Sequence, residues 1–177
     1  MMTQTKTRSL VLAALLAAVT AVLAQISLPI GPVPFTLAVL GAFLTGLLLP
    51  PSYAMASIGV YIVLGAIGMP VFAGFSGGPA ALVGPTGGYL VGYFLLALLP
   101  SVAVQKGVAT IGTIVAALLG LLGCYILGTA WFIFLTGNGL IASLGWCVMP
   151  FVLPDIAKAV VAVLLAKALR KRIRAVL

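Results

Sequence analysis

The chain has 177 residues, of which 64% are hydrophobic and only 6% are charged, and its formal net charge is +8. Soluble domains carry about 25% charged residues, so this composition excludes a soluble globular protein and indicates a surface that faces lipid. The sequence contains no histidine, which excludes histidine-based catalysis and removes the commonest metal ligand.

Apolar runs alternate along the chain with breaks that are rich in proline or glycine. A bilayer core needs about 20 apolar residues per helix, and fewer where a helix is buried in protein. We predict an all-α integral membrane protein, one domain over residues 1–177, with six spans at about 9–26, 35–49, 52–67, 89–104, 108–135 and 149–168. The second and third runs are short, so four full spans with a re-entrant pair is an open alternative.

The first run resembles a signal peptide, because Lys6 and Arg8 precede an apolar stretch that ends in small residues. We expect a retained helix instead, since a multispan protein can use its first helix as the insertion signal. Small side chains lie close together along this run: Ala13, Ala14, Ala17, Ala18 and Ala21. Small residues at a four-residue spacing let another helix approach closely, and that helix belongs either to this chain or to a partner.

A glycine-rich stretch without any charge, residues 68–88, separates the third and fourth runs. It has too many breakers for a helix, and irregular backbone near a membrane is tolerated only when it is buried in protein or lines a cavity. Phe72, Phe75, Leu82 and Val83 supply apolar surface to bury. We therefore predict a lid or a pocket wall in preference to a floppy external loop.

The stretch ends in a second set of candidate site residues. Gly87 and Gly88 allow close approach of the backbone. Thr86 and Tyr89 bring polar groups to the same side of the membrane.

The basic residues follow the positive-inside rule. Eight of the nine lie near the chain ends or at Lys106, and the exception is Lys158. The opposite connections, residues 29–34, 68–88 and 136–146, contain none. This bias predicts an even number of crossings with both termini cytoplasmic. No basic stripe interleaved with aromatic residues is present, which argues against nucleic-acid binding.

The only acidic residue, Asp155, lies in the last apolar run, and Lys158 follows at the i, i+3 spacing that places both on one helix face. If the helix begins near Met149, Asp155 lies about 9 Å below the outer boundary. The pair either neutralises itself inside the bundle or presents its charges to a ligand in a cavity. A buried ion pair gains little over apolar packing, so we favour the second interpretation. The ligand expected there is small and largely apolar, with hydrogen-bond donors and an acidic end.

Several motifs are absent. The sequence lacks a phosphate-binding loop, a nucleophile elbow and any metal-ligand cluster, so we expect no enzymatic activity, no cofactor and no ATP hydrolysis by a familiar route. Cys124 and Cys147 lie without metal-like spacing, and we interpret them as small buried hydrophobic residues.

Four stretches occur in the same order over nearly the whole chain: Gly-Pro-Val-Pro-Phe-Thr-Leu at 31–37, Gly-Met-Pro-Val-Phe-Ala-Gly at 68–74, Gly-Pro-Thr-Gly-Gly-Tyr-Leu at 84–90, and Pro150-Phe151 followed by Asp155-x-x-Lys158. In these stretches the chain resembles the BioY family, the biotin-binding membrane subunits (S components) of energy-coupling-factor (ECF) vitamin transporters.

The resemblance implies a six-helix S component in the bacterial plasma membrane, with an outward biotin pocket. The pocket would be capped by the loop between the first two helices and the loop before the fourth. Biotin would be bound by Asp155, Lys158, Tyr89, Thr86, Gly87, Gly88 and Phe72.

The resemblance also implies partners. The alanine face of the first span would dock on a transmembrane coupling subunit, and two ATPase subunits would supply energy, unless the protein works alone. Two alternatives remain open: a stand-alone proton-coupled carrier that uses Asp155, and a structural membrane protein without a ligand.

The chain departs from the family pattern at two places. Ala38 stands where the family often has glutamine, which removes a polar contact. Leu153-Pro154 replaces the usual Pro-Gly step before Asp155, which alters how the last helix opens toward the pocket.

Overall fold

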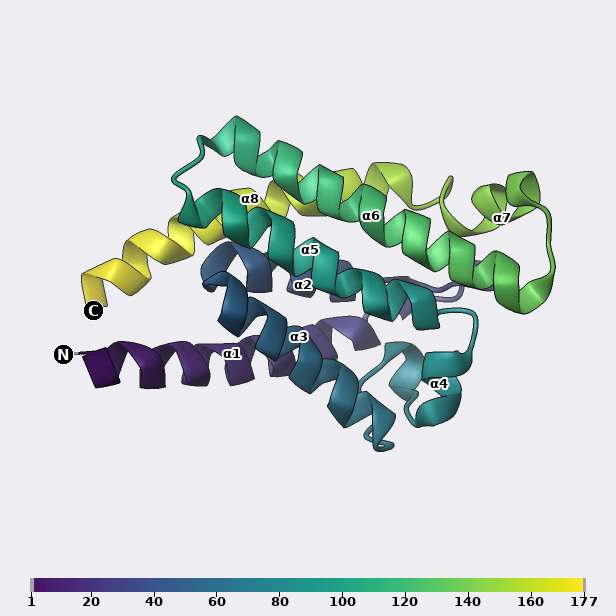
Figure 1. The fold of residues 1–177 in the computed structure, drawn as a ribbon, viewed down its shortest axis with the longest axis horizontal. Helices are drawn as coiled ribbons and strands as arrows, with labels where there is room; N and C mark the ends of the chain where they lie inside the picture. Colours follow the sequence, from purple (N-terminus) through teal and green to yellow (C-terminus); the bar gives the residue numbers. More distant parts are fainter. Residues whose placement is uncertain (1, 177) are drawn as a thin grey trace.

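The structure, a computed structural model, describes the backbone of residues 2–176 and the side chains of residues 6–170. Its elements are α1 (Met2–Gln25), β1 (Ser27–Leu28), β2 (Phe35–Thr36), α2 (Ala38–Leu48), α3 (Pro51–Ala66), the 3-10 turn η1 (Ala73–Phe75), α4 (Pro79–Val83), α5 (Gly87–Gln105), α6 (Thr110–Thr136), α7 (Leu140–Cys147) and α8 (Val152–Val176). The helices form an elongated bundle in which α5 and α6 lie side by side (Figure 1). The predicted helical fold class is thereby confirmed.

Four helices are long and apolar enough to cross a membrane, over Lys6–Gln25, Gly87–Gln105, Thr110–Thr136 and Met149–Arg170. The helices α2 and α3 have 11 and 16 residues. At 1.5 Å per residue they reach about 16 and 24 Å, which is short of a bilayer core of about 30 Å. Four of the six predicted spans therefore coincide with helices long enough to cross a membrane, and the count of six crossings stays a prediction.

The start of the second predicted span is wrong. Phe35 and Thr36 do not begin a helix; they pair antiparallel with Leu28 and Ser27 in a short hairpin. Proline residues in the connection prevent a helix, and the paired strands satisfy each other's backbone groups. The Thr36 hydroxyl then accepts a hydrogen bond from the Ala38 N–H at 3.0 Å, where α2 begins.

The glycine-rich stretch is also more ordered than predicted, because it contains η1 and α4. The short helix α4 begins at Pro79, which suits the first helical position because a residue there needs no N–H partner. Most of the connection between the fifth and sixth predicted spans, residues 136–146, forms the short helix α7.

Both ends of the chain lie at one end of the bundle, together with the connection from α5 to α6 (Figure 1). The β1–β2 hairpin, α4 and α7 lie at the opposite end. Lys6, Arg8, Lys106, Lys167 and Arg170 therefore share one end, as the positive-inside interpretation requires. Three further residues of the basic cluster, Lys171, Arg172 and Arg174, have side chains outside the described part of the chain.

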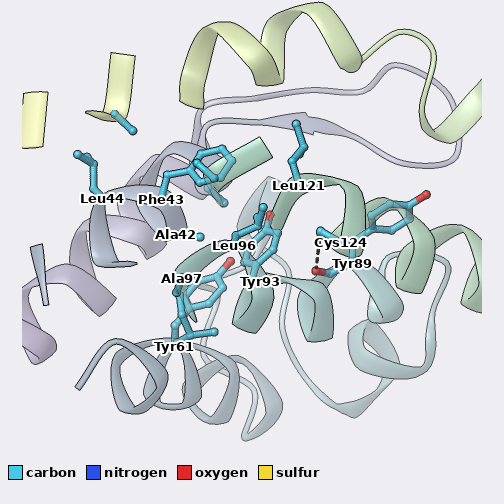
Figure 2. Packing of buried hydrophobic residues seen from close by; sticks show 14 of the residues in the cluster. Ala42, Phe43, Leu44, Tyr61, Tyr89, Tyr93, Leu96, Ala97, Leu121 and Cys124 are labelled. Atoms are coloured by element: carbon cyan, nitrogen blue, oxygen red, sulfur yellow. Dashed lines mark hydrogen bonds between the residues drawn. The ribbon is translucent and has the colours of Figure 1, made fainter. Parts of the chain in front are cut away.

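Close helix contacts hold the bundle together and position the site. A Cβ at Gly92 would lie 2.6 Å from Cys124 Sγ, so glycine lets α5 approach α6. Ser57 Oγ on α3 donates a hydrogen bond of 2.8 Å to the Ala13 carbonyl on α1. Figure 2 shows the buried core that results, with aromatic side chains from α2, α3 and α5 among aliphatic ones: Phe43, Tyr61, Tyr93, Leu96 and Ala97.

The alanine residues of α1 divide into two sets. Ala13 and Ala17 are buried inside the bundle, and Ala21 is half-buried. Ala14 and Ala18 are exposed. Ala13 and Ala17 therefore pack within the chain itself, and the docking role of the five alanines stays a prediction.

Candidate functional site

The Asp155–Lys158 ion pair lies at the start of α8. Lys158 Nζ is 2.7 Å from Asp155 Oδ1, which confirms that the two side chains share a helix face. The residues are only 4% and 7% exposed. Because α8 begins at Val152, Asp155 lies in its first turn, where the positive end of the helix dipole stabilises a carboxylate.

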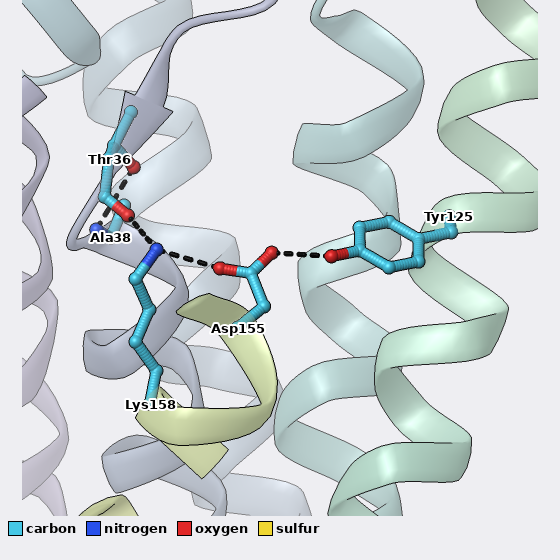
Figure 3. A network of polar contacts seen from close by, with 5 residues as sticks. All are labelled: Thr36, Ala38, Tyr125, Asp155 and Lys158. Atoms are coloured by element: carbon cyan, nitrogen blue, oxygen red, sulfur yellow. Dashed lines mark hydrogen bonds and ion pairs between the residues drawn. The ribbon is translucent and has the colours of Figure 1, made fainter. Parts of the chain in front are cut away.

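Other elements complete the coordination of this pair (Figure 3). The Tyr125 hydroxyl on α6 donates a hydrogen bond of 2.7 Å to Asp155 Oδ2. Lys158 Nζ donates one of 2.7 Å to the Thr36 carbonyl and lies 3.6 Å from the centroid of the Phe35 ring. Both carboxylate oxygens and the ammonium group therefore have protein partners, which offsets the cost of burying two charges.

Tyr125 was not predicted from the sequence. A tyrosine hydroxyl in the interior of a 27-residue apolar helix needs a polar partner. That requirement could have marked Tyr125 as a candidate site residue. The partner, however, lies 30 positions further along the chain. Tyr125 links α6 to the ion pair and orients the carboxylate.

Two adjoining cavities open beside the ion pair. The smaller, of about 50 Å³, has Asp155, Lys158 and Tyr125 in its wall. The larger, of about 170 Å³, is lined by Phe72 and Thr86 among others. Five residues line both cavities: Val33, Pro34, Thr36, Tyr89 and Tyr93. A ligand that occupied both would contact the ion pair at one end and the glycine-rich stretch at the other.

Aromatic rings form much of the wall. The Tyr61 ring stacks on Tyr93 with centroids 6.4 Å apart, and it meets Phe72 edge-on at 5.4 Å. Phe35 stacks on Phe151 at 6.4 Å, beside the ion pair. Such walls suit an apolar ring system, while the few polar groups set its orientation.

The glycine-rich stretch covers the larger cavity, and the prediction of a pocket wall is confirmed for Phe72. That residue is 3% exposed, and its ring contacts Gly65 so closely that a Cβ there would overlap it. Phe75 is 71% exposed and Val83 61% exposed, so the prediction that both would be buried is wrong. A lid anchored by a single aromatic ring leaves its outer side chains in contact with the surroundings.

The lid is tied to α1 through Gln25. The Phe75 N–H donates a hydrogen bond of 2.9 Å to Gln25 Oε1, and Gln25 Nε2 donates one of 3.5 Å to the Pro70 carbonyl. Phe75 has a φ of 57°, a conformation that is uncommon outside glycine. The Gln25 contact therefore helps to hold this backbone conformation.

The structure brings some of the predicted site residues together and separates others. Thr86 lines the larger cavity. Tyr89 lines both, with its hydroxyl 3.0 Å from the Thr129 hydroxyl. Gly87 and Gly88 line neither cavity. A Cβ at Gly88 would lie 2.8 Å from the Leu127 carbonyl of α6, and a Cβ at Gly87 would overlap the Leu82 carbonyl of α4, so both positions allow close backbone packing.

The two departures from the family pattern both have a structural place. Ala38 is buried and lines the larger cavity, so it leaves an apolar wall where a glutamine would have added a polar group. Pro154 lies in the first turn of α8, where a missing backbone N–H breaks no helical hydrogen bond.

The described part of the chain has few side chains of the types that bind metals. It contains no group of three or more potential metal ligands. Cys124 and Cys147 are free and buried, as predicted. Burial raises the pKa of the Cys147 thiol, so the protonated form persists at neutral pH.

The chain is similar in sequence and in structure to known proteins. The model described as "BioY family" matches residues 1–175. The "Probable biotin transporter BioY" of Pyrococcus horikoshii is 42% identical over 165 residues, covering 93% of this chain and 98% of its own. The "Biotin transporter BioY" of Thermotoga maritima is 40% identical over 174 residues, covering 93% and 96%. A crystal structure of the S-component for biotin from an ECF-type ABC transporter superimposes with a TM-score of 0.87 at 31% identity, over 97% of this chain and 95% of that one.

Proposed function

The chain belongs to the BioY family, and on that premise we propose that it is the membrane subunit that binds biotin and mediates its uptake. The observation that carries the proposal is a buried carboxylate–ammonium pair, Asp155 and Lys158, which lines an aromatic-walled cavity. The similarity to a biotin S-component supports the same conclusion.

The chemistry of biotin matches the groups in the cavity walls. Its ureido ring has N–H donors, and each Asp155 oxygen can accept a second hydrogen bond beside the one that it already accepts. Lys158 can donate to an oxygen of the ligand. The thioether ring and the aliphatic chain would pack against Tyr61, Phe72 and Tyr93, since sulfur and methylene groups contact aromatic rings favourably.

Entry of biotin requires movement of the hairpin or the lid. The two cavities measure about 170 and 50 Å³, whereas small-molecule pockets usually span about 300–1,000 Å³. Thr36 and Phe35 of the hairpin both contact Lys158, and Phe72 of the lid walls the larger cavity. Biotin would therefore separate these segments from the helices on entry and be enclosed when they return.

We further propose a single domain with six crossings of the plasma membrane and both termini in the cytoplasm. The common end of the basic residues supports this orientation. The packing of α1 through Leu16 and Ala24 supports a first helix that is retained.

A transmembrane coupling subunit would dock on the exposed alanines Ala14 and Ala18, and two ATPase subunits would energise transport. Replacing either alanine with leucine should impair assembly with the coupling subunit and spare biotin binding. Equal loss of both properties would remove the docking assignment.

Biotin binding to the purified protein, measured by isothermal titration, tests the proposal. The variants Asp155→Asn and Lys158→Ala, if they elute as folded protein, should bind biotin more weakly by orders of magnitude. If both bind like the unchanged protein, the site assignment is wrong. Biotin uptake into proteoliposomes that lack ATPases, driven only by a pH gradient, would instead indicate the proton-coupled carrier.

A further inference from the structure

One buried hydroxyl group in the wall of the larger cavity has no protein partner. Tyr61 on α3 is only 1% exposed, and it lines the larger cavity but not the smaller one. Among the described residues, none forms a hydrogen bond with its hydroxyl. Buried tyrosine hydroxyls usually have a hydrogen-bond partner, because leaving such a group unsatisfied is unfavourable.

The position of this hydroxyl points to a partner inside the cavity. The described residues contain no fully enclosed side-chain nitrogen or oxygen without a hydrogen bond, so the Tyr61 hydroxyl borders open space. Its ring is held by an edge-on contact with Phe72 at 5.4 Å and by stacking on Tyr93 at 6.4 Å. Figure 2 shows the side chain extending from α3 toward Tyr93. A ring that is fixed in this way holds its hydroxyl in place before a ligand arrives.

The other hydroxyl groups of this cavity are engaged or less deeply buried. Ser76 and Tyr89 form hydrogen bonds with protein groups. Tyr93 interacts with the side chain of Thr36, and Thr86 is only half-buried. No charged side chain lies among the described residues that line this cavity. The larger cavity therefore offers neutral hydroxyl donors, and the hydroxyl on α3 belongs to the most deeply buried of these side chains.

The smaller cavity is unfavourable for a negatively charged group. The two oxygens of Asp155 accept hydrogen bonds from Lys158 and Tyr125, and the ammonium charge is already matched by a carboxylate 2.7 Å away. A second carboxylate beside Asp155, in a cavity of about 50 Å³, would meet like-charge repulsion that water screens poorly. Neutral N–H donors of a ligand suit this end, and an acidic group suits the larger cavity.

On the basis of the proposed function, we propose that the Tyr61 hydroxyl donates a hydrogen bond to the carboxylate of biotin and selects ligands with an acidic end. Biotin then lies with its ureido ring at Asp155 and its carboxylate in the larger cavity, which Phe72 of the lid also lines. A hydrogen bond to an ionised acceptor is stronger than one between neutral groups, so a single phenol can contribute measurably to this choice.

Isothermal titration of the purified protein with two ligands tests the assignment. One ligand is biotin, and the other is an analogue whose side chain ends in a methyl group in place of the carboxylate. Tyr61→Phe removes only the hydroxyl. Tyr53→Phe is the matched control, because Tyr53 lies on the same helix and lines neither cavity. The ratio of the two affinities is measured within one preparation, so a smaller folded fraction does not change it.

Tyr61→Phe should weaken biotin binding by about tenfold to hundredfold, the effect of one hydrogen bond to a charged group, and should leave the affinity for the analogue unchanged. Tyr53→Phe should bind both ligands like the unchanged protein. If Tyr61→Phe weakens both ligands equally, or weakens neither, the role of the hydroxyl is overturned, whereas biotin binding by the unchanged protein would still support the proposed function. If the unchanged protein binds no biotin, the proposed function and the role of Tyr61 both fail.

Discussion

The ion pair at the start of α8 can be tested for its structural and functional roles separately. In the variant Lys158→Met, a side chain of similar length loses its charge, and Asp155 keeps only the hydrogen bond from Tyr125. Asp155 is only 4% exposed, so bulk water compensates little for the lost ammonium. Breaking a buried pair by removing one partner costs about 3–5 kcal/mol.

The expected loss is large enough to measure. For a protein of this size, each kcal/mol shifts the transition temperature by about 2–4 °C, so Lys158→Met should lower it by about 6–20 °C. The double variant Asp155→Asn/Lys158→Met removes both charges and should recover most of that loss, because replacing a buried ion pair by neutral groups is often close to neutral in stability. Neither variant should bind biotin with its original affinity.

Thermal unfolding in detergent and titration with biotin together provide the measurement. Lys106→Met is the matched control, because Lys106 is exposed and lines neither of the two cavities beside the ion pair. This variant should change neither the transition temperature nor the affinity for biotin. Recovery of stability without recovery of binding would show that the charges serve the ligand. Undiminished binding by the double variant would refute the functional interpretation, and an unchanged transition temperature in Lys158→Met would refute the energetic one.

Three further variants address the surroundings of the pair. Tyr125→Phe should lower the free energy of unfolding by about 1.5–3 kcal/mol, because Asp155 loses a charge-assisted hydrogen bond. The same variant should weaken biotin binding much less than Asp155→Asn does. Equal weakening of the two variants in biotin titrations would contradict this expectation. Gln25→Leu should speed the release of radiolabelled biotin by about fivefold, the effect of one lost hydrogen bond to the lid, and an unchanged rate would exclude the latch. Gly88→Ala should lower the transition temperature by separating α5 from α6 while the folded fraction keeps its biotin affinity; Gly59→Ala, where a Cβ meets no atom within 4 Å, should not lower it.

Local patterns in the sequence determined much of this protein. Composition alone indicated lipid as the solvent, and the distribution of basic residues predicted that both chain ends share one end of the bundle, where Figure 1 has them. The i, i+3 spacing of Asp155 and Lys158 was sufficient to predict their contact, because a helix brings such residues together wherever it lies. The breakers in residues 68–88 indicated a lid for the same reason: they act on their own segment.

Tertiary structure decided which residues complete the site. Lys158 contacts the Thr36 carbonyl across 122 positions, and Asp155 contacts Tyr125 across 30, and no local periodicity encodes either pairing. Gly88 packs against α6 and Gly87 against the Leu82 carbonyl of α4, contacts that the sequence does not encode locally. The alanines of α1 have identical side chains, yet Ala17 is buried in the bundle and Ala18 is exposed. In a chain that is apolar on every side, hydrophobicity does not distinguish the lipid-facing surface of a helix from its protein-facing surface, so only the packing of the other helices settles that choice.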